Sequence, residues 1–525
     1  MKKTSLYSII SIMAVASFVS CKSKSGSSDK TGMAYNKKEY GGFTVNNRYK
    51  RGPGPGLVEI EGGAFVIGGS AINVPGQELG NYNHKREITV NSFYIDETEV
   101  SNTNWLEYLN WIVTNFPKDY EYYYNELPDT LVWRRPLSYN EPYVENYLRH
   151  PAYQDYPVVG VTWEQAERYC EWRTDRVNEL LLRERGYMTS FKDKNGGTAN
   201  AGATTASAGS QGPFSTGTYL NNQIDDKGKR AMKDLNPSNA GNGTGKNMAT
   251  RNVRLEDGIL KSAYRLPFET EWEYAALGLI GNTQYENIND NKIYPWSGLG
   301  LSSAKKGTRG LILANFKRTK GDYMGVGGSL NDKGGITVAV RSYTPNDFGL
   351  YNMAGNVNEW VRDVYRPGTF EAADAFNPFR GNLYLDKKIA DPTTGKIAVD
   401  KYNRPVMTEA LYAKKQTWAE KQAAATKPAD SLKNAYADQR GFRDPQTELY
   451  GETTLVNDKS RVYKGGSWND QALWLNPASR RFLQQDESSA DIGFRCAMDM
   501  QGSPEIRSQG KPQFKNKPGK GFRGR

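Results

Sequence analysis

Loops that carry a tryptophan and are punctuated by glycine recur along most of this chain, and they set the strongest limit on how it can fold. Five such tryptophans are Trp172, Trp272, Trp296, Trp360 and Trp468, and glycines at positions 62, 63, 349, 355, 465 and 466 suit tight turns. A fold of short strands needs large rigid side chains in its interior, and aromatic residues make up 12% of the chain. The pattern predicts a loop-rich, aromatic-cored globule and argues against a coiled coil.

Short strands and a few helices are expected along the chain, which gives an α+β fold class. Alternating apolar residues predict strands at 57–66, with a tight turn at Gly62-Gly63, and at 88–95, 462–468 and 493–498. Apolar residues at helical spacing predict helices at 98–115, 162–179 and 269–277. Ser101 is a candidate cap for the first helix, and Thr162 begins a possible capping box for the second.

Two stretches of different composition interrupt this core. Residues 190–250 are rich in Gly, Ala, Ser, Thr and Asn, and residues 366–455 are polar, with a helix expected around 408–434. We therefore expect one domain over 57–500 with insertions at about 190–250 and 366–455. Because an enzyme core would be compact where these insertions lie, we expect both of them to contact partner proteins.

The first twenty residues have the layout of a secretory signal. Met1-Lys2-Lys3 is a short basic start, residues 7–19 are apolar and uncharged, and Phe18-Val19-Ser20-Cys21 resembles a lipobox. The apolar run is shorter than the roughly 20 residues of a transmembrane helix. We expect a lipoprotein signal peptide at 1–20, lipidation of Cys21, a linker over 21–56, and a location outside the cytoplasm of a bacterium. Ordinary secretion with cleavage elsewhere is the alternative.

The net charge of +11 does not by itself predict nucleic-acid binding. Lys22, Lys24 and Lys30 follow the lipobox, and residues 501–525 carry seven Lys or Arg against one Glu. The Gly, Pro and Lys content of 501–525 predicts a basic disordered tail. This tail is either a solvated segment or a contact for anionic lipid, glycan or an acidic partner.

Histidine and cysteine are too scarce for several kinds of chemistry. The two histidines, His84 and His150, disfavour a His-rich metal site, and the three cysteines, Cys21, Cys170 and Cys496, exclude a zinc site of four thiolates in one chain.

Nine short motifs, taken in order over residues 57–499, resemble the formylglycine-generating-enzyme (sulfatase-modifying factor) family. They are Glu61–Phe65 with Gly68, Phe93–Val100, Pro157–Trp163, Ala166–Trp172, Arg265–Pro267 with Glu271–Ala276, Tyr294–Trp296, Asn346–Trp360, Gly465–Trp468 and Gly493–Ala497. The resemblance implies a modified C-type-lectin-like fold, low in regular secondary structure.

The catalytic metal ligands of that family are missing here. Active members hold copper(I) with two cysteines that follow the Gly-Ser-aromatic turn, and thiolates suit this soft ion. The turn is Gly466-Ser467-Trp468 in this chain, and the matching positions are Asp470 and Leu475. We therefore expect no copper and no formylglycine synthesis, so the chain reads as a pseudoenzyme.

The resemblance also implies a disulfide and structural calcium. Cys170 and Cys496 match a structural disulfide pair of the family, with two buried free thiols as the alternative. Asn352, Gly355, Val357 and Glu359 match one family calcium site, and Asn315, Phe316, Asp332 and Gly334 match a second. The alternative is that Asn352 and Glu359 hydrogen-bond to loop amides.

Four longer segments narrow the resemblance further: Phe93–Val100, Asp129–Trp133, Asn146–Tyr153 and Trp172–Glu179. Together with the lipobox and the insertions, they are similar to the GldJ family of gliding-motility lipoproteins of Bacteroidota. Its sister family, GldK or PorK, forms part of the type IX secretion ring. The resemblance implies a non-catalytic outer-membrane lipoprotein that faces the periplasm and is required for gliding and for assembly or stability of the type IX machinery.

The partners implied are gliding and type IX secretion components, such as the sister ring lipoprotein, and the outer membrane through the lipid anchor. No nucleic acid is expected. Two other functions stay open on the sequence: a periplasmic lectin-like module that binds glycan or peptide, and an enzyme of the sulfatase-modifying family.

Overall fold

The computed structural model describes residues 26–28, 30–46, 52–68, 85–136, 139–191, 212–224, 226–236, 250–281, 292–318, 334–365, 379–381, 383–409 and 456–502. The chain divides into two compact units. The larger comprises Arg51–Leu181, Phe191–Asp225 and Lys261–Arg525, and the smaller comprises Met1–Lys50, Leu182–Ser190 and Asp226–Leu260. The predicted single domain over 57–500 therefore contains segments that belong to a separate unit.

The described part of the smaller unit has little regular structure. Its elements are η1 (Lys38–Tyr40), β5 (Met232–Lys233), β6 (Thr250–Arg251) and η6 (Leu255–Asp257), and β5 pairs antiparallel with β6. Arg251 donates to both carboxylate oxygens of Asp257 at 2.6 and 2.8 Å, which braces the turn after β6. Of these elements, β5 and the start of β6 lie within the predicted insertion at 190–250, so that stretch includes regular structure.

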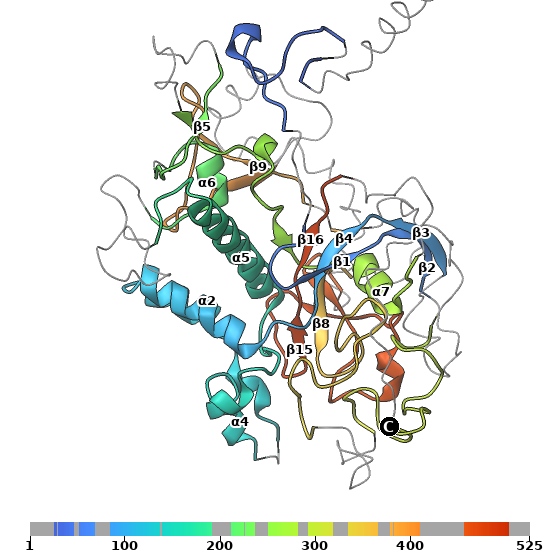
Figure 1. Ribbon diagram of the computed structural model, residues 1–525. Coiled ribbons are helices and arrows are strands. Elements are labelled where there is room, and N and C mark those ends of the chain that lie inside the picture. The colour runs from blue at the N-terminus through green and yellow to red at the C-terminus, as the bar shows by residue number, and fades with distance from the viewer. Residues whose placement is uncertain are drawn as a thin grey trace, which may run out of the picture. The chain divides into compact units, whose positions relative to one another are not determined.

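Two four-stranded sheets form the centre of the larger unit (Figure 1). The first runs β1 (Leu57–Ile60), β4 (Phe93–Asp96), β16 (Ala497–Asp499) and β7 (Tyr264–Arg265), all antiparallel. The second runs β14 (Arg481–Gln484), β13 (Ser460–Lys464), β8 (Asn358–Val364) and β15 (Ile492–Phe494), with β15 parallel to β8. Strands from the two ends of the domain thus share one sheet.

The helices in the described part of the larger unit lie before or between these strands in the chain. They are α2 (Asn102–Asn115), α3 (Tyr120–Glu126), η2 (Thr130–Trp133), α4 (Glu141–Asn146), η3 (Pro151–Tyr153), α5 (Trp163–Glu184, whose last residues belong to the smaller unit), α6 (Thr216–Leu220), α7 (Glu269–Leu277) and η8 (Ala472–Leu475). Ser101 accepts from the Asn104 amide, and the Thr162 hydroxyl accepts from the Gln165 amide, so both expected caps are confirmed. The α5 helix continues five residues beyond its predicted end.

Several predicted strands are divided between sheets. The stretch at 57–66 gives β1 and β2 (Gly63–Ile67), but β1 pairs with β4, whereas β2 pairs with β3 (Arg86–Val90). Between β1 and β2, a Cβ on Gly62 would lie 2.3 Å from the Val90 carbonyl oxygen, so only glycine allows these two backbone segments to approach so closely. The predicted strands at 88–95 and 493–498 are likewise each split into two strands that lie in different sheets.

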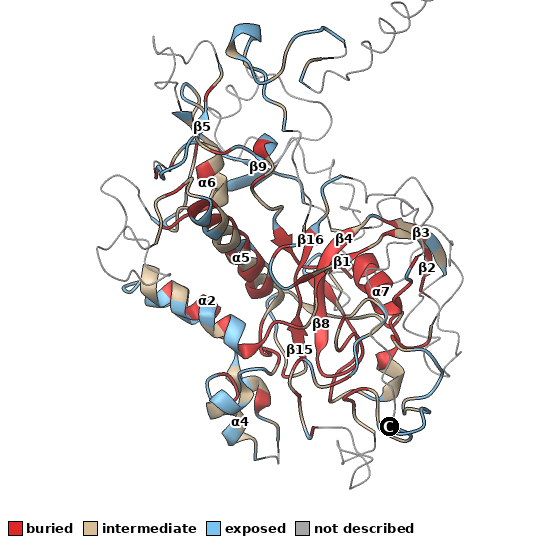
Figure 2. Ribbon diagram, in the orientation of Figure 1, coloured by how far each residue is buried: buried red, intermediate tan, exposed pale blue. Residues whose placement is uncertain are grey.

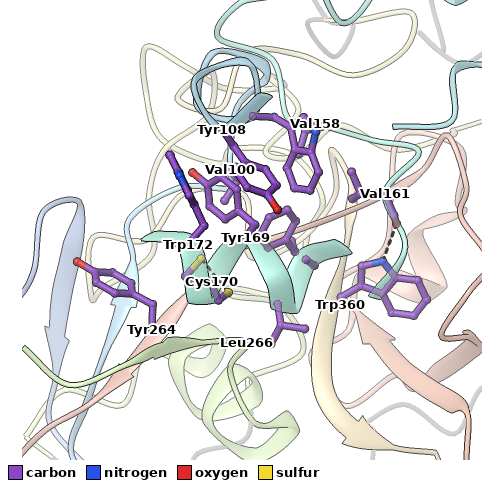
Figure 3. Packing of buried hydrophobic residues seen from close by; sticks show 14 of the residues in the cluster. Val100, Tyr108, Val158, Val161, Tyr169, Cys170, Trp172, Tyr264, Leu266 and Trp360 are labelled. Atoms are coloured by element: carbon purple, nitrogen blue, oxygen red, sulfur yellow. Dashed lines mark hydrogen bonds between the residues drawn. The ribbon is translucent and has the colours of Figure 1, made fainter. Parts of the chain in front are cut away.

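Aromatic side chains fill the main core of the larger unit, as the sequence predicted. Trp105 on α2 stacks with Tyr169 on α5 at 5.4 Å between ring centroids, and Phe494 of β15 packs edge-on against both rings. Figure 3 shows Tyr108, Tyr169 and Trp172 gathered above Cys170, with the Trp360 indole bonded to the Val161 carbonyl. Figure 2 shows that burial is densest in α7 and the central strands.

The described part of the second insertion forms strands. They are β9 (Leu385–Lys387), β10 (Ile389–Asp391), β11 (Lys396–Ile397) and β12 (Met407–Glu409), which pair as β9 with β12 and β10 with β11. The helix expected around 408–434 begins on strand residues, and residues 410–434 lie outside the described part. In the first insertion, α6 buries Tyr219 beside Phe214, so this segment is partly ordered as well.

No helix in the described segments combines the length and the hydropathy needed to span a bilayer.

Candidate functional site

An ion pair between Asp470 and Arg481 lies just after the turn Gly466-Ser467-Trp468, at the first of the two positions that match copper ligands. Arg481 donates to the two carboxylate oxygens of Asp470 at 2.6 and 2.7 Å, and Ser467 and Asn358 donate to the same carboxylate at 2.6 and 2.9 Å. Burial alone would raise the pKa of Asp470, but the hydrogen bonds and positive charge of Arg481 outweigh it and hold the pKa below its usual value. The carboxylate is therefore ionised and fully engaged with neighbouring donors.

The second copper position is a hydrophobic contact. Leu475, at the end of η8, is completely buried in a cluster with Tyr294, Phe316 and Ala354. Its side chain has no atom that coordinates a metal. The Arg481 guanidinium, which pairs with Asp470, also lies over the ring of Trp474, the residue before Leu475, at 4.6 Å from the ring centroid.

Glu359, a predicted calcium ligand, is bound by an arginine. Arg495 donates to Glu359 Oε2 at 2.6 Å through Nε and to Oε1 at 2.5 Å through Nη2, and the Trp272 indole also donates to Oε2 at 2.7 Å. Glu359 and Arg495 are both completely buried. As arranged, the carboxylate has its counter-charge already, so this residue does not fit a calcium ion unless Arg495 moves away.

Asn352 lies in the same loop and also has protein partners. Its amide donates to Glu99 at 3.0 Å and to the Val340 carbonyl at 3.1 Å, and the Asn356 amide donates to the other oxygen of Glu99 at 3.0 Å. Burial raises the pKa of Glu99 to about 8 against the opposing charge of Arg495. The loop is thus held by the side-chain amides of Asn352 and Asn356, which donate to Glu99. This differs from the alternative in which Asn352 and Glu359 bond to loop amides, because the printed partners of Glu359 are Arg495 and Trp272.

Five of the six remaining predicted calcium ligands lie among the described residues. Gly355 and Val357 contribute backbone only, and Gly355 adopts a positive φ of 82° directly against the Asn315 carbonyl. Asn315 and Phe316 are buried and Gly334 is described, but Asp332 lies outside the described residues. Structural calcium at either set stays a prediction.

The two core cysteines lie together. Cys170 of α5 and Cys496, between β15 and β16, have their sulfurs 3.3 Å apart, and both are buried thiols in the structure. The juxtaposition that the family resemblance implied is therefore present, while the bond itself stays a prediction. Cys21, the predicted lipidation site, lies outside the described residues.

A cleft of about 530 Å³ opens beside the connection from β4 to α2, within the larger unit. Its lining includes Glu97, Glu107, Asp155, Trp172 and Arg341. Asp470 and Leu475 do not line it. No sequence pattern indicated this cleft, because α2, α5 and residues 340–341 meet there only through the tertiary fold.

A second buried cluster of charged residues was also not predicted from the sequence. Lys464, at the end of β13, is completely buried and lies 2.8 Å from Glu273 and 3.4 Å from Glu269 of α7. Asp363 of β8 accepts from the backbone amide of Glu269 at 2.8 Å. Burial, and then the negative charge of Glu269, raises the pKa of Asp363 to about 7. This cluster ties α7 to β8 and β13.

Comparison with known proteins gives one family match. The model of the sulfatase-modifying factor enzyme 1-like domain matches residues 42–500.

Individual relatives match more narrowly. The serine/threonine-protein kinase pkn1 of Chlamydia pneumoniae is 25% identical over 59% of this chain and 28% of its own length. The formylglycine-generating enzyme of Mus musculus is 31% identical over 26% of this chain and 29% of its own length. The inactive C-alpha-formylglycine-generating enzyme 2 of Mus musculus is 28% identical over 23% of this chain and 32% of its own length. The chain therefore spans less than a third of the length of each of these relatives.

Proposed function

This chain belongs to the sulfatase-modifying factor enzyme 1-like domain family, and from that membership we propose that it is a member without formylglycine-generating activity, which acts as a structural lipoprotein. The family includes an inactive relative. We further propose that its core is the modified C-type-lectin-like form of the family fold, a proposal supported by its short strands and long connections.

The observation that carries the proposal is the chemistry of positions 470 and 475, which match the copper-binding cysteines of active family members. Copper(I) prefers thiolate ligands, whereas Asp470 is a hard oxygen ligand already bound by Arg481, and Leu475 has no donor atom. Replacing two thiolates by an ion pair and a buried leucine exchanges a reactive centre for contacts that hold the Gly466-Ser467-Trp468 turn in place. This chemistry favours a scaffold over a catalyst.

A peptide oxidation assay tests the proposal. The purified chain, loaded with copper(I), is incubated with a cysteine-containing sulfatase peptide, and formylglycine is measured by mass spectrometry. An active formylglycine-generating enzyme is the positive control. We expect no copper-dependent conversion by this chain. Conversion that requires copper and turns over repeatedly would refute a non-catalytic role.

The cellular part of the proposal is a lipid-anchored outer-membrane protein, facing the periplasm, that gliding motility and the type IX secretion machinery require. Support comes from the sequence: the lipobox at Cys21, the lysines that follow it, and the segments similar to the GldJ family. Crosslinked affinity purification of the tagged protein from outer membranes tests it. We expect type IX secretion ring components in the eluate, and a Cys21→Ser variant should lose both the membrane location and those components. A protein that elutes alone, or with sulfatases, would contradict this assignment.

The second insertion supplies a surface for such a partner. Its described part is fixed to the core, because Tyr402 packs on Tyr122 at 4.2 Å between ring centroids and Lys401 pairs with Asp119 at 2.8 Å. Beyond this attachment it exposes large apolar side chains: Leu383, Tyr384, Leu385 and Met407 are each 45–56% exposed. A rigidly mounted group of exposed apolar residues is typical of protein interaction sites.

Aspartate substitutions test this surface. Leu385→Asp combined with Met407→Asp should leave the protein folded and lipidated but remove the co-purifying ring components. Leu311→Asp is the matched control, because Leu311 is 41% exposed outside the insertion. Unchanged co-purification by the double variant would show that the partner binds elsewhere.

A further inference from the structure

Lys464, at the end of β13, is a buried ammonium with two acceptors for its three N–H donors. Its side chain has no exposed surface, and its hydrogen bonds go to Glu273 at 2.8 Å and to Glu269 at 3.4 Å. No third acceptor for it lies among the described residues. A buried charge with an unused donor is costly, so this side chain needs a physical account.

The carboxyl group of Glu273 is contacted by a nitrogen on each of its oxygens. Lys464 Nζ contacts Oε2, and the backbone N–H of Gly68, the residue after β2, donates to Oε1 at 2.8 Å. The Glu273 side chain is 3% exposed. An amine that attacks the carboxyl carbon drives negative charge onto one oxygen, and an N–H group already in contact with that oxygen stabilises the charge.

Glu269 lies one turn before Glu273 on α7 and is placed to carry a proton. Its Oε1 accepts from Lys464, and its Oε2 accepts from Arg480 at 2.9 Å. Burial raises the pKa of Glu269, but the positive charges of Arg480 and Lys464 outweigh it and hold the pKa below its usual value. Glu269 is therefore an ionised carboxylate within reach of the lysine nitrogen.

We propose that Lys464 and Glu273 become joined by an amide bond that the folded chain forms by itself, with Glu269 as the proton carrier. The bond replaces a buried cation with three donors by a neutral group with one. The amide N–H then donates to Glu269, the carbonyl Oε1 accepts from Gly68, and Glu269 keeps Arg480 as its counter-ion. This modification goes beyond the scaffold role and depends on neither copper nor a partner.

The step releases one water and needs no other reactant. Lys464 first gives a proton to Oε2 of Glu273, which turns the buried ion pair into an amine and a carboxylic acid. The nitrogen lone pair attacks the Glu273 Cδ, and the C=O electron pair moves onto Oε1. Glu269 takes a proton from the attacking nitrogen and returns it to the Oε2 hydroxyl. The C–Oε2 bond breaks, water leaves, and the C=O bond forms again at Oε1.

Burial and fixed geometry favour this condensation, which free amines and carboxylic acids do not undergo in water. Side chains held in contact react as if present at about 10⁵–10⁸ M. The lysine and Glu273 side chains are 0% and 3% exposed, so bulk water is kept from the forming bond. The two residues are 191 positions apart, so the bond ties α7 to β13 covalently and independently of redox conditions.

Mass spectrometry of a tryptic digest of the full-length chain, reduced with dithiothreitol, tests the proposal. Trypsin does not cleave after an acylated lysine. We expect a branched peptide that joins residues 266–292 to residues 462–480 and is one water lighter than the sum of the two. Fragmentation of this peptide should place the link at Glu273 and Lys464.

Two variants and an internal control locate the chemistry. Lys464→Arg keeps the positive charge but should abolish the branched peptide. Glu269→Gln cannot take up the proton and should leave most of the chain unlinked, because general base catalysis contributes about 10²–10⁴-fold to such steps. Lys401 and Asp119 are the control: they also pair at 2.8 Å, but Lys401 is 58% exposed, so no linked peptide should join them.

Each outcome decides for or against the bond. Complete cleavage after Lys464 in the unaltered chain, with both peptides at their sequence masses, overturns the proposal. A loss of water that persists in Lys464→Arg also overturns it, because the water then comes from another site. Equal linkage of Lys401 to Asp119 would show unselective condensation, and undiminished linkage in Glu269→Gln would refute the proton-carrier step. Should either variant fail to fold, the digest of the unaltered chain still decides.

Discussion

The ion pair between Asp470 and Arg481 gives the sharpest test of what stabilises the turn at Gly466-Ser467-Trp468. Asp470→Asn keeps the size of the side chain and removes its charge, which leaves the Arg481 guanidinium without its counter-ion. The two side chains are 11% and 19% exposed, and their closest nitrogen–oxygen distance is 2.6 Å. Charges about 4 Å apart at an effective dielectric constant of 20 interact by about 4 kcal/mol.

The expected loss of unfolding free energy follows from these values. Removing one partner of a buried ion pair costs about 3–5 kcal/mol, and the remaining exposure of both side chains places this pair near the lower end, at about 3 kcal/mol. Urea unfolding of the full chain, followed by tryptophan fluorescence, measures the loss. Because the folded-state pKa of Asp470 is depressed, its contribution is complete above about pH 4 and is lost as the pH falls through the folded pKa. The penalty should therefore be constant from pH 5 to 8 and shrink below about pH 4.

A matched control distinguishes burial from mere pairing. Arg134 also donates to both oxygens of Glu141, at 2.8 and 3.1 Å, but these side chains are 57% and 38% exposed. Glu141→Gln should cost about 0–1 kcal/mol. The double variant Asp470→Asn with Arg481→Met should lose less than the sum of its single variants, since the two side chains interact. A penalty for Asp470→Asn no larger than that of Glu141→Gln would refute the reasoning.

Three further predictions concern the core. Glu359→Gln should cost about 3–5 kcal/mol, because it leaves a completely buried guanidinium unpaired, whereas Glu97→Gln at an exposed pair should cost about 0–1 kcal/mol; urea midpoints compare the two. Mass spectrometry of unreduced peptides should find Cys170 linked to Cys496 in protein from an oxidising compartment, and recovery of both as free thiols would contradict the predicted bond. The pKa of Asp363 is raised to about 7 in the folded protein, so the protonated side chain contributes stability that is lost as the pH rises through 7. Asn stays neutral, so Asp363→Asn should stabilise the protein more at pH 8 than at pH 5. Equal shifts of the urea midpoint at both pH values would contradict this.

The sequence predicted the elements that depend on local chemistry. Ser101 and Thr162 cap the helices that they precede, because a cap and the amide it accepts from lie within three residues. The aromatic core was likewise expected, since tryptophan and tyrosine in a loop-rich chain have few other places to be buried. The pairing of strands was harder to predict. β1 and β2 are consecutive in the chain yet join different sheets, and between them Gly62 packs directly against the backbone of residues 90–92 at the end of β3.

The sequence by itself determined which atoms stand at the copper turn: a carboxylate at 470 and a hydrocarbon at 475 in place of two thiolates. Tertiary structure alone decided what these residues do. Arg481 lies eleven positions after Asp470 and Asn358 lies more than a hundred before it, so no local pattern marks them as partners. The same holds for Arg495 and Glu359, and for the cleft between α2 and α5. Long-range contacts depend on where the chain returns in space, and that is fixed by packing of the whole core rather than by local residue spacing.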